Sequence, residues 1–377
     1  MPPKRPRTET LQTSEASDTH ALQVVRASSR LSAEQKASLT SFEEVFSSPL
    51  GSYLLIELLS TCNISVALLQ KARDICIDKS FSECKYADMA PLFGLDPNAG
   101  GLDITPLVPL HCRIPLAVWK TILEGVDQVE DEIGTVSLHV NENTRSQWIA
   151  AWFRPLVALF RSRIRKMPER TMLGHRTKGG RIELQYWLHA QCLLVVIEVK
   201  FSLSDNIAAQ DALAQLFAEL DAADFRNRKE TLAVPTVRGV LTDGTRFRFV
   251  DYNSGTISQS DVYSVDTNNY QATAATMKPI CEIFFASLLE GWKHGLEAYR
   301  ARLLTQELTG ARRASATEWQ AACIAAVEAL KLASEMNPAD KDRQAKDVIA
   351  LIEQSVTVVQ KARLAGFYRE TSAYSTD

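Results

Sequence analysis

The chain has 377 residues, of which 46% are hydrophobic and 23% are charged, a composition typical of a soluble globular protein with two or three domains. The formal net charge of −3 excludes a globally basic nucleic-acid-binding protein, so any nucleic-acid contact must come from a local patch. The seven cysteines are odd in number and lack C-x-x-C spacing, which argues for a reducing compartment and against a zinc site. We expect a nuclear or cytoplasmic, intracellular protein with no membrane partner, because neither a secretory signal nor a run of about 18 apolar residues is visible.

The N-terminal part of the chain carries no catalytic constellation. Residues 1–30 are polar and lack periodicity, which predicts a disordered basic tail. Its cluster Lys4-Arg5-Pro6-Arg7 is of nuclear-import type or is simply a solvated basic end. Residues 31–130 are predicted to form a helical accessory domain, which begins at a capping box at Ser32 and includes a helix over Pro115–Val129.

A third helix is predicted directly after Asn141-Glu142, because large apolar side chains recur on one face up to Phe160. Pro155 lies within this run and predicts a kink or a restart. The stretch 161–181 that follows is the most basic part of the chain, and Glu169 is the only acid interleaved in it. Such a cluster suits phosphate binding, although a solvated helix face is the usual fate of a charge run.

Two strands with a short connection come next, over Arg181–Leu188 and Cys192–Phe201. The second contains a continuously apolar, β-branched run and then Glu198-Val199-Lys200, which is typical of a strand buried on both faces. An antiparallel hairpin that turns at Ala190-Gln191 would place Glu183 directly opposite Glu198. Residues two apart lie on one face, so Lys200 would project beside Glu198.

Two carboxylates at opposed strand positions repel each other, and a hard divalent cation turns that repulsion into a chelate. Lys200 would then orient or deprotonate a water bound to the cation. The alternative is a pair of surface acids closed by a salt bridge to the lysine, which conflicts with the burial that the preceding five residues require.

The rest of the chain is predicted to be helical apart from one hairpin. An amphipathic helix covers Asn206–Leu220, and Asp243-Gly244 marks the turn of a strand pair that a further strand over Thr256–Val265 extends. A long helix covers Thr276–Leu304. Residues 306–377 form a C-terminal helical hairpin, over Trp319–Met336 and Lys341–Leu364, suited either to packing on the preceding domain or to self-association.

At the hairpin the chain resembles the PD-(D/E)xK restriction-endonuclease-like superfamily, and the arrangement over about Glu142–Tyr252 looks like a Crinkler-like nuclease domain. The resemblance implies an α/β (α+β) fold with a mixed sheet flanked by helices, over residues 131–305. It implies Mg²⁺ (or Mn²⁺) held by Glu142, Glu183 and Glu198. Lys200 would be the catalytic lysine, with Gln215 (or Gln210) lining the site. Glu183 stands where the family usually has Asp after Pro, so the identity of that ligand departs from the pattern.

The sequence therefore predicts a metal-dependent nuclease that hydrolyses DNA phosphodiester bonds, with RNA as a further possible substrate. The alternative is a catalytically inactive relative that binds nucleic acid or protein on the same fold. A protein partner or a second copy of the chain at the terminal helices is a third possibility.

Overall fold

The computed structural model describes residues 77–189, 191–305, 310–335 and 341–361. The chain divides into two compact units, Met1–Ile77 and Asp78–Asp377. The predicted tail, its basic cluster and the first accessory helices lie outside the described residues. The second unit begins inside the predicted accessory domain, so residues 78–130 belong to the same compact unit as the sheet.

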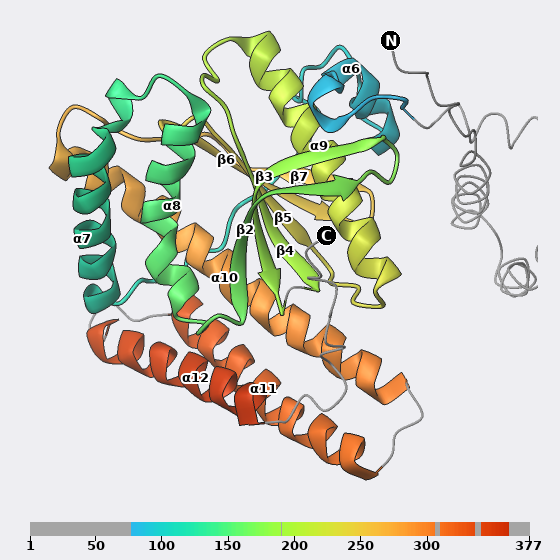
Figure 1. Cartoon of the computed structure of the whole chain (residues 1–377), viewed down its shortest axis with the longest axis vertical. Coiled ribbons are helices and arrows are strands. Elements are labelled where there is room, and N and C mark those ends of the chain that lie inside the picture. The colour runs from blue at the N-terminus through green and yellow to red at the C-terminus, as the bar shows by residue number, and fades with distance from the viewer. Residues whose placement is uncertain (1–76, 190, 306–309, 336–340, 362–377) are drawn as a thin grey trace, which may run out of the picture. The chain divides into compact units, whose positions relative to one another are not determined.

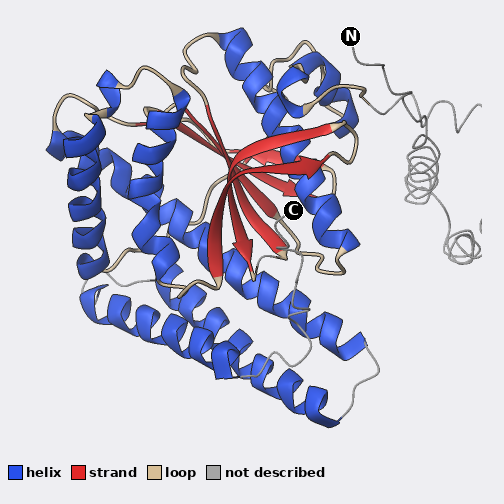
Figure 2. Cartoon of the chain, in the orientation of Figure 1, coloured by secondary structure: helices blue, strands red, loops and turns tan. Residues whose placement is uncertain are grey.

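The second unit is a mixed α/β structure in which helices flank one mixed sheet (Figure 2). The described strands are β1 (Thr105–Pro106), β2 (Ile164–Leu173), β3 (Gly179–Leu188), β4 (Cys192–Val199), β5 (Val237–Thr242), β6 (Arg246–Asn253), β7 (Thr256–Gln259) and β8 (Tyr263–Ser264). Their order across the sheet is β1-β7-β6-β5-β4-β3-β2, with β8 paired to β6. The pairs β4–β5 and β1–β7 are parallel, and the other pairs are antiparallel.

The described helices are η2 (Phe81–Glu83), α6 (Tyr86–Met89), η3 (Ala90–Phe93), α7 (Leu116–Ile133), η4 (Val136–Leu138), α8 (Glu142–Ala158), α9 (Asn206–Lys229), α10 (Tyr270–Thr305), α11 (Gly310–Ser334) and α12 (Lys341–Lys361). The structure confirms the helices predicted after Pro115 and Asn141. Pro155 lies inside α8, and the helix continues past it to Ala158 instead of restarting.

Strand β4 lies inside the sheet, between β5 and β3, and is buried along its whole length. On its neighbour β5, a Cβ on Gly239 would contact Leu216 and Leu220 of α9, whereas Arg238 donates to Ser287 and Glu290 of α10. Since successive residues of a strand face opposite sides, α9 covers one face of the sheet and α10 the other (Figure 1). This double cover explains the uninterrupted apolar run of β4.

Strand β2 is an element that the sequence did not predict. It runs through the basic stretch and pairs with β3 from Ile164↔Leu188 to Leu173↔Gly179. It was not predicted because its many charged residues leave no clear alternation of apolar and polar residues, and because Pro168 argues against the interior of a strand. The proline is tolerated because β2 lies at the end of the strand order, as an edge strand. Glu169, next to it, has a φ of +51°.

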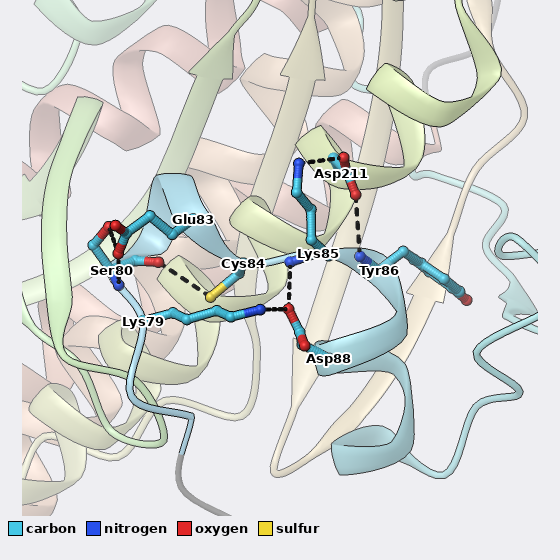
Figure 3. A network of polar contacts seen from close by, with 8 residues as sticks. All are labelled: Lys79, Ser80, Glu83, Cys84, Lys85, Tyr86, Asp88 and Asp211. Atoms are coloured by element: carbon cyan, nitrogen blue, oxygen red, sulfur yellow. Dashed lines mark hydrogen bonds and ion pairs between the residues drawn. The ribbon is translucent and has the colours of Figure 1, made fainter.

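A polar network links residues 79–88, at the start of the second unit, to α9 (Figure 3). Lys85 Nζ lies 2.7 Å from Asp211 Oδ2, and the backbone amide of Tyr86 donates to Asp211 Oδ1 at 3.3 Å. Lys79 forms an ion pair with Asp88 at 2.6 Å. Cys84 is buried within this network, and the other described cysteines are also free and buried.

The C-terminal helices confirm the predicted helical hairpin, and α11 and α12 lie side by side against α10 (Figure 1). Trp292 of α10 donates to Ser355 of α12 at 2.9 Å, and the hydroxyl of Ser355 donates to the carbonyl of Ala322 on α11 at 2.8 Å. Helix α10 is long and apolar enough to cross a membrane by length and composition, but 72% of that window is buried inside the protein. The core helix of a soluble protein has the same properties.

Candidate active site

Glu183 and Glu198 are brought together by the pairing of β3 with β4. The pair Leu184↔Ile197 places Glu183 directly opposite Glu198, as the sequence predicted. The register at the turn, however, differs from the predicted one. Leu188 pairs with Cys192 there, and this register, if it continued along the strands, would place Glu183 opposite Ile197.

A β-bulge restores the register. Tyr186 pairs with Val195 and Trp187 with Leu193, so Leu194 is an extra residue on β4. The insertion shifts the pairing by one position, which moves Glu198 opposite Glu183 and onto the same face of the sheet. Without the bulge the two carboxylates would lie on opposite faces. The geometry of the site therefore depends on one inserted residue four positions before Glu198.

On the side of the sheet that α9 covers, four side chains form a continuous polar chain. Lys200 Nζ lies 2.6 Å from Glu198 Oε1 and donates to Gln215 Oε1 at 2.9 Å. The amide nitrogen of Gln215 donates to Glu219 Oε1 at 2.9 Å. Glu198 and Glu219 are 3% and 0% exposed, so these are interactions of a dry interior rather than of a solvated surface. Gln215 is thus placed as predicted, whereas Gln210 lies beside Gly100.

The N-terminus of α8 supplies the third glutamate. Asn141 caps the helix by accepting from the amide of Thr144 at 2.9 Å, which leaves Glu142 in the first turn. Glu142 is exposed, and its Oε1 accepts from the backbone amide of Phe201 at 3.2 Å. One turn later, the hydroxyl of Ser146 donates to Glu183 Oε1. The helix therefore contacts both strands of the carboxylate pair.

Arg145 fixes the loop that follows Lys200. Its guanidinium lies 4.6 Å from the centroid of the Phe201 ring and donates to the carbonyl oxygens of Phe201 and, at 2.9 Å, Asp243. The backbone amide of Lys200 donates to the carbonyl of Thr242 at 2.8 Å. These contacts hold the main chain on which Lys200 is mounted.

Burial dominates the electrostatics of the carboxylates. It raises the pKa of Glu183 to about 7; the charges of Glu198 and Glu142 add to the rise, and hydrogen bonds from Ser146 and the Val199 amide oppose it. Burial also raises the pKa of Glu198, although the ammonium of Lys200 acts in the opposite direction. Burial alone would lower the pKa of Lys200, but the adjacent carboxylates outweigh it and raise that pKa, so the side chain stays an ammonium.

Glu219 is a site residue that the sequence analysis missed. Its burial, followed by the charge of Glu198, raises its pKa well above the ordinary range, which favours the protonated carboxyl. Among the described residues, its Oε2 has no hydrogen-bond partner. Ser146 was also missed. In both cases the available signal was i,i+4 spacing on a helix, from Gln215 to Glu219 and from Glu142 to Ser146.

The oxygen ligands that Glu142, Glu183 and Glu198 offer fit a hard divalent cation. These carboxylates repel one another, and burial disfavours the charges of Glu183 and Glu198. The single ammonium of Lys200 offsets this cost only in part. Protein groups hold these oxygens in the structure: Ser146 and the Val199 amide hold Glu183, and the Phe201 amide holds Glu142. Among the described residues, no three His, Cys, Asp or Glu side chains are already arranged as a metal-ligand group. Binding a cation therefore requires these carboxylates to exchange partners.

Tertiary structure supplies acidic partners for about half of the basic stretch. Arg161 pairs with Glu353 at 2.8 Å, Lys178 with Asp78 at 3.0 Å and Arg181 with Glu169 at 3.1 Å. Arg176 lies 3.6 Å from the buried Asp221. These four side chains are paired with acids in the structure, and phosphate binding by the other basic residues of the stretch stays a prediction.

No family model matches the chain, and no curated protein matches it. Among solved structures, the chain is similar to one described as "cryoEM structure DrdV-DNA complex", with 13% sequence identity and a TM-score of 0.24. The match covers 70% of this chain and 27% of the other, so it spans about a quarter of that protein.

Proposed function

We propose that the chain is a metal-dependent nuclease of PD-(D/E)xK type, built on a restriction-endonuclease-like sheet, that hydrolyses DNA phosphodiester bonds. One observation carries the proposal: carboxylates from adjacent strands, the buried Glu198 and the half-buried Glu183, lie opposite each other with the ammonium of Lys200 2.6 Å from Glu198. A salt bridge alone needs one acid, and burying a second like charge beside it is costly without a function.

Glu183 and Glu198, with Glu142 after it releases the Phe201 amide, would hold Mg²⁺ or Mn²⁺. When bound, such a cation polarises a phosphoryl oxygen and lowers the pKa of a coordinated water. Lys200 remains protonated, so its role is to orient the attacking water and to offset the charge that develops on the phosphate, rather than to accept a proton. Gln215 holds the ammonium in position through its side-chain oxygen.

A plasmid assay tests the proposal. The purified full chain should nick supercoiled plasmid with Mg²⁺ or Mn²⁺, and EDTA should abolish nicking. Lys200→Ala should reduce cleavage by about 100-fold or more and leave DNA binding intact, because the lysine acts on the transition state.

Lys178→Ala is the matched control, since it removes a lysine whose partner, Asp78, is on the surface. Nicking by Lys200→Ala at the wild-type rate would contradict the assignment. A wild-type protein that binds DNA but never cuts it would instead be a binding module on the same fold.

A further inference from the structure

Trp187, on β3, carries two guanidinium groups over its indole ring. The Cζ atom of Arg170, from β2, lies 4.9 Å from the ring centroid, and that of Arg226, from α9, lies 4.8 Å away. The indole is fully buried, and its nitrogen donates to Gln185 Oε1 at 2.9 Å. Each cation gains from the ring, but the two like charges repel each other, and the charge of Arg170 lowers the pKa of Arg226.

In the part of the chain that the structure describes, no carboxylate lies within ion-pair distance of this pair of like charges. Neighbouring arginines are neutralised: Arg181 by Glu169 at 3.1 Å and Arg228 by Asp224 at 2.8 Å. Within the described ranges, neither Arg170 nor Arg226 forms an ion pair.

Arg226 also has an unmet hydrogen bond. Its Nε is buried and has no hydrogen-bond partner among the residues that the structure describes. A buried donor of this kind calls for an explanation, such as a water or an ion. Burial and the charge of Arg170 lower the pKa of Arg226, and Glu230 offsets them only in part, so a bound anion would stabilise this side chain.

We propose that Arg170 and Arg226 together bind one phosphate group, with Trp187 as the platform that aligns their guanidinium planes. Guanidinium groups match phosphate oxygens with paired N–H donors, and an anion between the two would relieve their repulsion. The phosphate can come from a nucleic-acid backbone or from free phosphate.

The place of this pair favours the backbone. Glu183 and Trp187 are four residues apart on β3, so they lie on one face of the sheet, about 13 Å apart along the strand. That is roughly the axial length of four nucleotides of a B-form strand, at about 3.4 Å each. A strand bound at the two glutamates can therefore reach the arginine pair; this part of the inference rests on the proposed nuclease function, whereas phosphate binding itself does not.

Thermal unfolding with and without inorganic phosphate tests the site directly. Phosphate should raise the unfolding temperature of the wild-type chain but not of the Arg170→Gln/Arg226→Gln double variant, because a ligand that binds only the folded state stabilises it. Arg228→Gln is the matched control. It removes an arginine of the same helix that is already paired with Asp224, so phosphate should raise its unfolding temperature as much as that of wild type.

Binding of a short DNA duplex in EDTA, at several salt concentrations, separates the two sources. If the pair holds a backbone phosphate, the slope of log K against log salt should be shallower in the double variant by about 0.9. An unchanged slope with a lost phosphate response assigns the site to free phosphate. The proposal is overturned if neither measurement separates the double variant from wild type.

Failure of this site is distinguishable from failure of the nuclease assignment, because both measurements are made without a metal and without cleavage. If the double variant does not fold, Arg170→Lys/Arg226→Lys replaces it. That variant keeps both charges but loses the planar guanidinium groups with their paired N–H donors, so it should bind phosphate more weakly than wild type. Equal affinity would again overturn the proposal.

Discussion

The carboxylate of Glu198 is surrounded by groups that each compensate part of its burial. Lys200 supplies a positive charge, and Glu219 supplies a proton. Gln215 connects the two, since its oxygen accepts from Lys200 and its nitrogen donates to Glu219. An amide side chain has one donor end and one acceptor end. Glu219 therefore decides which end of Gln215 faces the lysine, and it acts as a positioning residue.

Glu219→Leu tests this role. Leucine offers no acceptor to the nitrogen of Gln215, which frees Gln215 to turn, so Lys200 loses its fixed acceptor. Cleavage should fall by about 10- to 100-fold, which is typical when a residue that positions a functional side chain is replaced. The loss should appear in kcat with KM and DNA affinity unchanged, measured by steady-state kinetics and fluorescence anisotropy.

The control for this variant is Glu230→Gln, which removes a glutamate from the exposed end of α9. It should cleave as wild type does. If Glu219→Leu keeps the wild-type kcat, or if it changes only KM, Gln215 is oriented by something other than Glu219.

At the scale of elements, the distance between α9 and the sheet sets the position of Gln215. The helix lies directly on β5 at Gly239, where a Cβ would meet Leu220 Cδ1 at 2.9 Å and Leu216 Cδ2 at 3.0 Å. Leu216 is the residue after Gln215, so any outward movement of α9 at this point moves the amide away from Lys200. The glycine is needed here for close approach, not for an unusual φ.

Gly239→Ala should therefore destabilise the fold by about 1–3 kcal/mol through overpacking and also slow cleavage. Urea unfolding and the plasmid assay measure the two effects. Gly125→Ala in α7 is the control: its Cβ would meet nothing within 4 Å, and alanine in a helix interior should stabilise by about 0.5–1 kcal/mol. Unchanged stability and cleavage in Gly239→Ala would show that the leucines yield and that α9 does not move.

The whole unit is held together where the C-terminal helices meet the turn of the β3–β4 hairpin. His189 follows β3 and makes ring contacts with Trp292 and Tyr299 of α10 and with Trp319 of α11. Burial lowers the pKa of this imidazole to about 3, and the charges of Arg163 and Arg165 add to that effect. The C-terminal helical hairpin is thus packed on the unit that contains the sheet, and self-association through its outer face stays a prediction.

His189 makes the stability of this unit dependent on pH. The unfolded chain binds a proton at its ordinary pKa of 6.5 and the folded chain only at about 3. The contribution of the neutral imidazole is therefore complete above pH 6.5 and is lost as the pH falls towards 3, by at most about 1.4 kcal/mol per pH unit.

His189→Asn should be less stable than wild type at pH 7.5, because it loses the ring contacts, but it should lose less stability between pH 7.5 and 5. Asparagine suits this position because it tolerates the φ of +48° found here. Urea unfolding at the two pH values measures both effects. Equal losses in the two proteins would show that the imidazole is not buried in its neutral form.

Local pattern was sufficient for the elements that carry the site. The apolar run before Glu198, the two-residue spacing to Lys200 and the helical periodicity around Gln215 are properties of neighbouring residues, and burial depends on them directly. The strand pair and the helices on either side of it could therefore be predicted. The opposition of Glu183 to Glu198 depends on the bulge at Leu194, which local pattern does not predict, because an extra residue in one strand is defined only by its partner strand.

Tertiary structure decided what distant segments do to these residues. Arg161 meets Glu353 and Arg176 meets Asp221, so part of the basic stretch became structural, while Arg170 and Arg226 met over Trp187 without an acid. Glu219 became a member of the site only because α9 packs against β4. The physical reason is common to all of these cases: the free energy of a charge depends on which groups replace its water, and those groups come from segments far away in the chain.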